Sequence, residues 1–415
     1  MRTGTGKKGR IIAGLDVGTT KICCIVSALT DEGEIDVIGL GVSPSRGLRK
    51  GVVVNIESTV ESIKKAVEEA ELMAGVQVNS VYVGIAGSHI TGFNSRGYIT
   101  IQNENEGVSQ ADKTRAHEKA RPSRETFPKD REEIHTLPQA YIVDDQDEIK
   151  DPLGICGGRL EVDVYIVTGA KMAIQNVKRS VQRAGLEVVG VILQPLASSK
   201  AVLTSEETDL GVGMVDLGGG TADLAIYSQG SLVHTAVLPI GGNHFTQDVA
   251  VGFRISQAEA EKVKITHGSA TSEEVGDDEM FEAVGIGGRP PREVSRKALS
   301  EVLEPRAEEM FELVGREIKQ AGHEGTVVAG LVLSGGTALL HGITDVAERV
   351  LDLPVRVGSP GDLNGLRNIV KSPIYATAVG LILEAWHPSE GEEPGLDGTW
   401  QQSRNVFRRI KDWFF

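Results

Sequence analysis

The chain has 415 residues, and its 58 acidic and 43 basic side chains give a formal net charge of −15. This length allows several hydrophobic cores and suggests two to three domains. The acidic balance argues against nucleic acid as a partner, because polyanions repel one another. No apolar run reaches the roughly 18 residues of a membrane span, and the basic N-terminus lacks the apolar core of a secretory signal. We therefore expect a cytosolic protein.

A glycine-rich hairpin is predicted near the start of the chain, within Gly14–Val26, which reads GLDVGTTKICCIV. An apolar strand ends at Asp16, the turn Gly18–Thr20 follows, and a second apolar strand leads away from it. A third strand is expected over Glu34–Leu40, after a further turn that contains glycine.

Helices and buried strands follow this hairpin. Ser43–Val54 is expected to be a loop, and Ile56–Ala74 a helix capped by Asn55, because its apolar residues recur at helical spacing. The strand Val81–Ile85 is expected just before residues 88–167. After that stretch the expected elements are helix Lys171–Ala184, strand Val188–Leu193 and helix Pro195–Leu203.

Residues 88–167 differ in composition from the chain around them. Tyr98–Gln102, Thr136–Val143 and Leu160–Val167 read as strands, and Ser109–Ala120 as a polar helix that begins at a capping serine. The stretch has no glycine-rich phosphate signal, so we interpret it as a small α/β insertion.

A second glycine-rich hairpin is predicted within Gly211–Gly230, which reads GVGMVDLGGGTADLAIYSQG. Its first arm ends at Asp216, three glycines and Thr221 form the turn, and Ala222–Tyr227 alternates as the outgoing strand. Leu232–Leu238 is expected to be a third strand, as in the first hairpin.

The two hairpins share one pattern, D-V-G-T-T in the first and D-L-G-G-G-T in the second. Glycine-rich turns expose backbone N–H groups that can wrap a phosphate, and an aspartate at the strand end can hold Mg²⁺ through water. The repeat suggests two duplicated domains that clamp a nucleotide from both sides; two unrelated glycine-rich hairpins are the alternative. Asp223, on the outgoing strand, is expected to matter less for the metal than Asp216.

The part of the chain that follows residue 240 is predicted to be largely helical. Gly241–Val251 and Gln257–Thr266 are expected helices, and Ser269–Gly288 reads as an acidic, irregular segment. The remaining predicted elements are helix Val294–Gln320, strand Thr326–Leu333, helix Thr344–Leu351 and helix Ile374–Ala385.

The last 29 residues differ from the globular body. Residues 387–402 are rich in Pro, Gly and Glu and read as a disordered linker. Within residues 403–415, large apolar residues occupy one face of a predicted helix, and basic residues occupy the others, which is typical of a helix lying in a membrane surface. The alternative is a helix docked in a groove of this chain or of a partner. The expected membrane residues are Val406, Phe407, Arg408, Ile410, Trp413 and Phe414.

Five motifs, in order along the chain, resemble those of the ATPase superfamily that includes actin, sugar kinases and heat-shock chaperones. The two hairpins resemble its phosphate loops, and Val332–Ala338 its adenosine motif. Leu193–Ser198 and Pro373–Gly380 are similar to its two connecting helices. The resemblance implies an α/β fold of two duplicated, ribonuclease H-like domains that binds ATP and Mg²⁺.

The resemblance also implies roles for individual residues. Asp16 and Asp216 would organise Mg²⁺, and Gln194 and Asp216 would serve hydrolysis. Glutamine can orient a water but cannot remove its proton, so slow ATPase activity at most is expected where many relatives have Glu. Phosphate contacts would come from Gly18, Thr19, Thr20, Lys21, Gly218, Gly219, Gly220 and Thr221, and nucleoside contacts from Glu261, Lys264, Gly335 and Gly336.

Within this superfamily the chain resembles the FtsA family of bacterial cell-division proteins. The insertion, the acidic linker and the terminal amphipathic helix carry this resemblance, together with segments such as Gly84–Ile90 and Ala260–Lys264. A chaperone would instead carry a substrate-binding β-domain and a helical lid. A soluble small-molecule kinase with the same core is the alternative, although no aspartate base for a substrate hydroxyl stands out.

The family resemblance implies an actin-like protein that polymerises on the cytoplasmic face of the inner membrane at the division septum. It would bind the C-terminal peptide of FtsZ, anchor FtsZ filaments through its terminal helix and recruit later division proteins. The implied domains are a first actin-like domain (1–87 and 168–206), an inserted subdomain (88–167), a second core (207–250 and 322–386), an FtsZ-binding subdomain (251–321), a linker (387–402) and a membrane-targeting helix (403–415).

Overall fold

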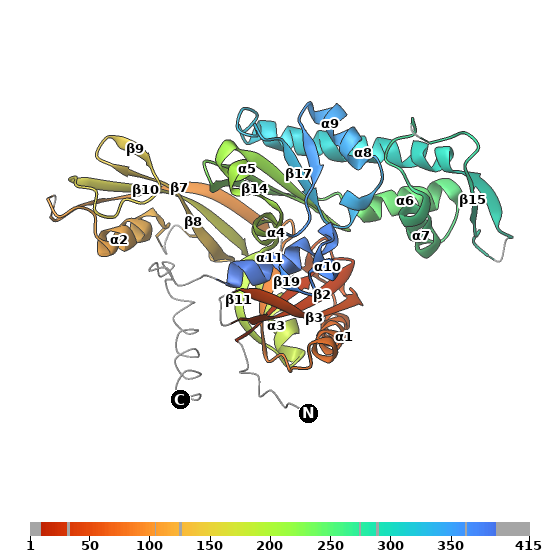
Figure 1. The fold of residues 1–415 in the computed structure, drawn as a ribbon, viewed down its shortest axis with the longest axis horizontal. Helices are drawn as coiled ribbons and strands as arrows, with labels where there is room; N and C mark the ends of the chain where they lie inside the picture. The colour runs from red at the N-terminus through yellow and green to blue at the C-terminus, as the bar shows by residue number, and fades with distance from the viewer. Residues whose placement is uncertain are drawn as a thin grey trace.

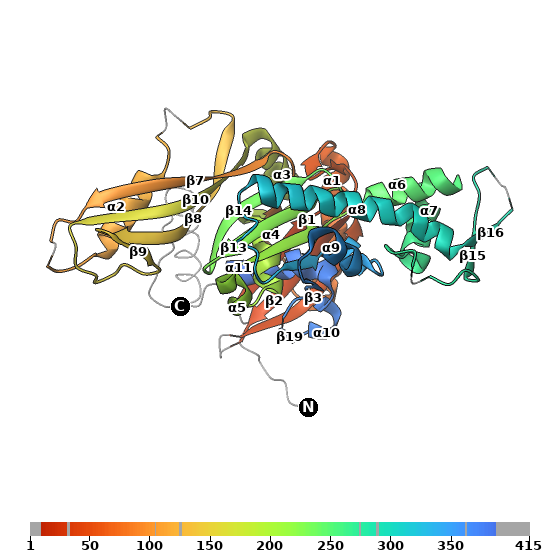
Figure 2. The same cartoon turned by 90° about the horizontal axis from the view of Figure 1, so that it is seen from above.

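The computed structural model describes residues 10–386 apart from 31–33, 104, 124–126, 274, 288–289 and 362. Two α/β cores lie one above the other in Figure 1, with a long sheet extending to one side and a lobe of helices and a ribbon to the other. From above, the helix α8 (Arg296–Gln320) crosses from the second core into that lobe (Figure 2). The mixed α/β class expected from the sequence is confirmed.

The first core is built on a sheet with the strand order β11-β6-β1-β2-β3-β19. β1, β2 and β3 form an antiparallel meander, while β6 and β11 run parallel to β1. Both faces are covered: Cys23 packs with the cluster that includes α11, and its neighbour Cys24 with the cluster that includes α1. The bounds are β1 Ile11–Val17, β2 Lys21–Leu29, β3 Ile35–Pro44, β6 Ser80–Ile85, β11 Glu187–Leu193, β19 Asn364–Gly365, α1 Ile56–Ala74, α3 Lys171–Arg183, α4 Gln194–Val202 and α11 Ala376–Ala385.

The second core repeats the arrangement of the first. Its sheet has the order β14-β13-β12-β17-β18, again an antiparallel meander followed by two strands parallel to its first strand. This order matches β3-β2-β1-β6-β11, so the duplication expected from the two hairpins is confirmed. The bounds are β12 Val212–Leu217, β13 Ala222–Ser228, β14 Ser231–Leu238, β17 Leu331–Ser334, β18 Val355–Val357 and α9 Ile343–Leu351.

The insertion forms a separate sheet with the order β7-β10-β8-β9, and α2 packs against β7 and β10. Ser109 caps α2 through a capping box with Asp112, as its sequence position indicated. β7 and β8 begin earlier than predicted, because polar and glycine-containing segments pair along the whole length of β10. The bounds are β7 Ile90–Thr100, α2 Gln110–Ala120, β8 Arg131–Val143, β9 Gln146–Ile149 and β10 Arg159–Ala170.

The helical lobe contains α6 (Gly242–Phe253), α7 (Gln257–His267), the start of α8 and a two-stranded ribbon. The ribbon, β15 (Met280–Ala283) with β16 (Arg292–Ser295), corrects the prediction that the acidic segment is irregular throughout. It also corrects the predicted start of the long helix, since Ser295 ends β16 and caps α8 instead of lying inside it.

Several short elements were not predicted. The segment expected to be a loop after β3 contains a small ribbon, and β17 begins at Leu331 because Gly330 adopts a φ of +86°, which interrupts an extended strand. These elements are β4 Leu48–Arg49, β5 Val52–Val53, α5 Ser205–Leu210, η1 Thr337–Leu339, α10 Arg367–Val370 and η2 Pro373–Tyr375.

Residues 364–386 return to the first core, although the expected domain boundaries placed them in the second. β19 pairs with β3 in parallel, and α11 packs against β1, β2, β6 and α4. The physical reason is that Ala376–Ile382 is buried on every side, so this helix needs apolar cover all round, which the space between the first sheet and α4 provides.

Candidate functional site

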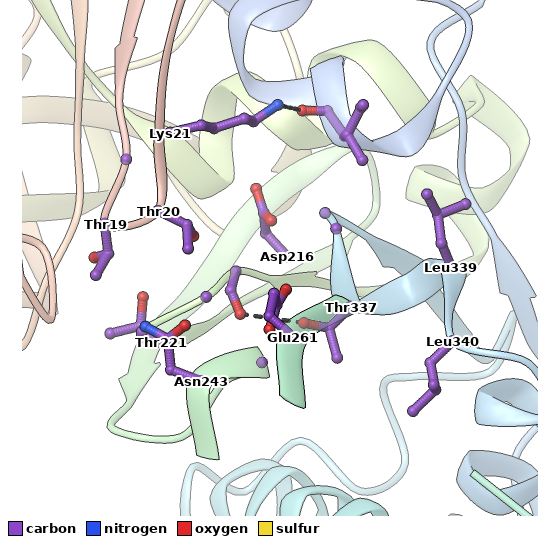
Figure 3. A pocket seen from close by; sticks show the side chains of 18 of the residues that line it. Thr19, Thr20, Lys21, Asp216, Thr221, Asn243, Glu261, Thr337, Leu339 and Leu340 are labelled. Atoms are coloured by element: carbon purple, nitrogen blue, oxygen red, sulfur yellow. Dashed lines mark hydrogen bonds between the residues drawn. The ribbon is translucent and has the colours of Figure 1, made fainter. Parts of the chain in front are cut away.

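A cavity of about 500 Å³ lies between the two cores and is lined from both glycine-rich hairpins. Figure 3 shows Thr19, Thr20 and Lys21 on one side and Asp216 and Thr221 opposite them. All of the nucleotide and catalytic residues predicted from the sequence line this cavity. Its volume suits a small molecule about the size of a nucleotide.

The two hairpin turns have the same local geometry. The N–H of Gly18 donates to the carbonyl of Lys21 at 3.1 Å, and the N–H of Gly218 donates to that of Thr221 at 3.0 Å. The turns also approach each other closely, since a Cβ at Gly219 would lie 2.1 Å from Oγ1 of Thr20. A side chain at Gly219 would therefore displace Thr20 where one loop faces the other.

Asp16 lies at the end of β1 and is 7% exposed. Gln194, the first residue of α4, donates a hydrogen bond from Nε2 to Oδ1 of Asp16 at 2.8 Å. Burial raises the pKa of Asp16 to about 7, with nearby Asp216 adding to the rise and Lys21 opposing it. A cation beside Asp16 would keep this carboxylate ionised.

Asp216 is held by two hydroxyl groups that sequence reasoning did not single out. Ser198 of α4 donates to its Oδ2 at 2.7 Å, and Thr377 of α11 donates to the same oxygen at 2.9 Å. Both hydroxyls are buried, and they lie in the two segments that resemble the superfamily's connecting helices. Thr377 is the single polar residue of the segment Ala376–Ile382, which made it a candidate, although its partner could not be predicted from the sequence; Ser198 lies among other polar residues of α4 and had no such signal.

Asp223 also lies in the wall of the cavity, paired across the hairpin with Asp216. It is 5% exposed, and burial, reinforced by Asp216, raises its pKa well above the usual range. Thr221 donates to its Oδ2 at 3.3 Å, while its Oδ1 has no hydrogen-bond partner among the described residues. The expectation that Asp223 matters less than Asp216 rested on strand position, which does not reveal this burial.

The acidic wall fits a hydrated divalent cation. Asp16 and Asp216 face the cavity, and the buried, unpartnered oxygen of Asp223 is an acceptor that a metal-bound water can satisfy. Hard oxygen ligands of this kind are those that Mg²⁺ prefers, usually with several waters retained.

Lys21 lines the cavity but does not point along the second phosphate loop. Its ammonium group donates to the carbonyl of Ile374 and lies 4.7 Å from the ring centroid of Tyr375 (Figure 3). The charge expected at the phosphate tail is therefore directed, in this arrangement, toward the segment that precedes α11.

Glu261 and Lys264 form one cluster in the wall of the cavity. Nζ of Lys264 donates to Glu261 at 2.8 Å, to Oγ1 of Thr246 at 3.0 Å and to the carbonyl of Gly242 at 3.1 Å. Because Gly242 begins α6 beside the second phosphate loop, this cluster fixes the loop as well as the wall.

The opposite wall contains the predicted adenosine motif. Gly335 adopts a φ of +83°, and a Cβ there would lie 2.4 Å from Oδ1 of Asp216, so only glycine fits. At Gly336 the nearest atom to an added Cβ is 4.0 Å away, which leaves open space for a ligand. Ile265 and Leu339, which were not predicted, add an exposed apolar surface that suits a planar base.

The residues predicted to contact a membrane lie outside the described residues, as does the linker before them. Among the helices that the structure describes, none combines the length and apolar character needed to cross a bilayer.

Comparison with known families matches two parts of the chain. The family "Cell division protein FtsA" matches residues 213–380, and the family "SHS2 domain inserted in FTSA" matches residues 87–168. The second match falls on the inserted sheet with α2.

Comparison with individual proteins extends the match to nearly the whole chain. The cell division protein FtsA of Pseudomonas aeruginosa is 43% identical over 98% of both chains, and that of Neisseria meningitidis is 41% identical over 97% of this chain and 98% of its own. Among solved structures, the PilM-PilN type IV pilus biogenesis complex has a TM-score of 0.64 at 17% identity, covering 91% of this chain and 99% of its own. MreB5 of Spiroplasma citri bound to ADP has a TM-score of 0.54 at 17% identity, covering 90% and 95%.

These structural neighbours are similar in fold, and the sequence relatives are similar over nearly their full length. The chain therefore belongs to the FtsA family of cell division proteins, within the actin-like fold.

Proposed function

We propose that the protein binds ATP with Mg²⁺ in the cleft between its two cores and uses the bound nucleotide in bacterial cell division. The single observation that carries this proposal is the pair of matching glycine turns that face each other across the cavity, each preceded by a buried aspartate. The MreB5 structure with ADP supports it, since that protein has the same overall fold.

In this proposal the backbone N–H groups of Gly18–Thr20 and Gly218–Thr221 hold the phosphates. Asp16 and Asp216 position the cation, whose charge would offset that of the phosphates. Gly336 admits the nucleoside, while Ile265 and Leu339 cover the base.

Hydrolysis is proposed to be slow. Gln194 carries an amide, which can orient a water but cannot accept its proton at neutral pH. Its Nε2 is already engaged by Asp16, which fixes the side chain beside the aspartate. Bound nucleotide would then act mainly as a conformational switch that is turned over infrequently.

We further propose that the protein polymerises on the cytoplasmic face of the inner membrane at the division septum. Self-association into actin-like filaments is supported by the fold that the chain shares with MreB5. Membrane attachment is supported by the amphipathic pattern of Val406–Phe414 beyond a polar linker.

The proposed partners are FtsZ, through its C-terminal peptide, and later division proteins. The subdomain over residues 251–321, which contains α7, the β15–β16 ribbon and α8, is the proposed site for the FtsZ peptide. The inserted domain is the proposed site for later proteins and for filament contacts. Family membership supports these assignments, since the relatives that match nearly the whole chain are cell division proteins.

Pelleting with lipid vesicles tests the proposal most directly. The full chain with Mg-ATP should sediment with vesicles that contain anionic lipid, and a variant lacking residues 405–415 should stay in the supernatant while binding ATP as before. A soluble kinase would be indifferent to this deletion. Equal sedimentation of both chains would contradict the membrane proposal, and failure to bind ATP in an isothermal titration would contradict the nucleotide proposal.

A further inference from the structure

The inserted domain is attached to both cores, although the chain enters and leaves it within the first. β7 follows β6 and β10 leads into α3, which are both elements of the first core. Yet β7, β8 and β10 all contact β14, the edge strand of the second sheet. Figure 1 shows β14 at the root of the inserted sheet. The insertion therefore bridges the two halves of the molecule.

Tyr165 of β10 is at the centre of this bridge. It is 1% exposed, and its hydroxyl accepts a hydrogen bond from the backbone N–H of Thr235 at 2.8 Å and lies 3.0 Å from Oγ1 of the same residue. An edge strand would otherwise present this N–H without a partner. Gly92 makes room for the ring, since a Cβ there would lie 2.0 Å from the hydroxyl.

A second polar contact lies beside Tyr165. Gln139 is the extra residue of a bulge in β8, between Pro138 and Ala140, and bulges re-aim the groups of the extra residue. Its Nε2 donates to the carbonyl of Leu232 at 3.1 Å, and its own carbonyl accepts from Oγ of Ser231 at 3.0 Å. We call the Tyr165–Thr235 and Gln139–Leu232 contacts the β14 clasp.

β14 is connected to the second phosphate loop in two ways, both at its C-terminal end. Its last residue, Leu238, pairs with Ala222 of β13, which follows Thr221 of that loop directly. Beyond Leu238 the chain returns to the loop, where Gly242 and Asn243 donate backbone hydrogen bonds to the carbonyls of Gly218 at 2.9 Å and Gly219 at 2.8 Å. A shift of the loop therefore moves the C-terminal end of β14, which lies close in sequence to Thr235 of the clasp.

We propose that the β14 clasp couples the occupancy of the phosphate loops to the attachment of the inserted domain. The clasp is formed in the arrangement in which Thr20 closely faces Gly219. A ligand that bridges both loops stabilises this same arrangement, so ligand and clasp strengthen each other by thermodynamic linkage. The inference rests on the proposed nucleotide function and adds the route by which nucleotide state reaches the inserted domain.

Tyr165→Phe tests the clasp in the full chain, because it removes the hydroxyl and keeps the ring. Tyr141→Phe is the matched control: Tyr141 lies in the same sheet, is 2% exposed, and bonds Nε2 of His117 at 2.7 Å in the core beneath α2. Amide hydrogen exchange with and without Mg-ATP, together with nucleotide titration, measures the coupling.

In the parent chain and in Tyr141→Phe, Mg-ATP should slow exchange at Thr235 and along β8 and β10. In Tyr165→Phe this protection of the inserted domain should be lost, and nucleotide affinity should fall about five-fold, as expected for one neutral hydrogen bond. Gln139→Ala, at a partly exposed position, should reduce both the protection and the nucleotide affinity, but by less than Tyr165→Phe does. It replaces Tyr165→Phe as the test if that variant folds poorly.

Two results would overturn the inference. If Tyr165→Phe and Gln139→Ala keep the parent's affinity and protection, the clasp does not couple the sites, while the proposed function stands. If the parent binds no Mg-ATP in the titration, the proposed function fails first and the coupling with it.

Discussion

The hydroxyl of Thr377 donates a hydrogen bond of 2.9 Å to Oδ2 of Asp216, a residue 161 positions away in the chain. Ser198 donates to the same oxygen at 2.7 Å, so the carboxylate is oriented by groups from α4 and α11 at once. Both helices also pack against each other. The orientation of Asp216, in the second core, therefore depends on how α4 and α11 of the first core pack against it. We expect substitutions of Asp216 to change nucleotide binding.

Replacing Asp216 with Asn should weaken Mg-ATP binding by about 10- to 100-fold, because hydrogen bonds to a charged group are worth roughly 1.5–3 kcal/mol. Asp223→Asn should have a smaller effect, since burial already favours the neutral form of that side chain. Isothermal titration with Mg-ATP measures both variants. Equal affinity of Asp216→Asn and the parent chain would refute the assigned role.

The parent chain should hydrolyse ATP at less than about 1 s⁻¹, the low end of ordinary enzymes, because Gln194 cannot act as a base. Gln194→Glu should hydrolyse ATP faster than the parent, and the gain should increase with pH. The new carboxyl group would lie beside Asp16, and two adjacent carboxyl groups resist being ionised at the same time. Release of inorganic phosphate measures both rates, with Gln194→Ala as the inactive control. A faster parent, or a slower Gln194→Glu, would contradict this interpretation.

The junction of the inserted domain with the first core should lose stability in mild acid. Nε2 of His135 accepts a hydrogen bond from the backbone N–H of Leu193 at 3.0 Å, and burial lowers the pKa of His135 to about 4. Between pH 6.5 and about 4 the unfolded chain binds a proton at this residue that the folded chain does not, so stability falls as the pH falls through this window. The loss should reach at most about 3 kcal/mol near pH 4.

Urea unfolding at pH 7.5 and pH 5 measures this effect. His135→Gln keeps an acceptor but cannot titrate, so the difference in unfolding free energy between the two pH values should shrink. Burial also lowers the pKa values of His89 and His323, which act in the same direction, so the comparison is made between variants. His267→Gln on α7 is the control, and a His135→Gln chain with the parent's full pH dependence would exclude this assignment.

Membrane attachment should be weak for one chain and strong for a polymer. In the helix predicted from the sequence of residues 403–415, each large apolar side chain would gain at most about 1.5–3 kcal/mol on insertion, and each basic one roughly 1 kcal/mol against anionic lipid. Ordering the segment costs about 1–2 kcal/mol per residue, so the net gain for a single tail is small. In a filament each further tail binds at high effective concentration.

Trp413→Glu should therefore release the protein from anionic vesicles without changing ATP affinity, as measured by pelleting and by titration. Added salt should detach single chains more readily than filaments. The linker over residues 387–402 would span about 20–24 Å as a flexible coil, enough for neighbouring tails to reach one bilayer. A polymerisation-blocked variant that bound vesicles as tightly as the parent would rule out the avidity argument.

The sequence by itself determined the features that depend on neighbouring residues. A strand, a glycine turn and a second strand are specified within about 20 residues, so both hairpins, and with them Asp16 and Asp216, could be located before any fold was known. The helix caps at Asn55 and Ser109 were predictable for the same reason, since a capping side chain bonds a backbone N–H only three residues away.

Only the tertiary structure decided which distant segments meet. No local pattern indicated that α11 returns to the first core, that Thr377 orients Asp216, or that Tyr165 bonds Thr235. The ribbon over Met280–Ala283 was missed because an acidic segment with few apolar residues has weak strand periodicity, and pairing with β16 formed it. Buried polar groups form hydrogen bonds, and apolar faces pack, with whichever groups lie near them in the folded chain. These groups are often distant in sequence, so the spacing of residues along the chain does not predict the contacts.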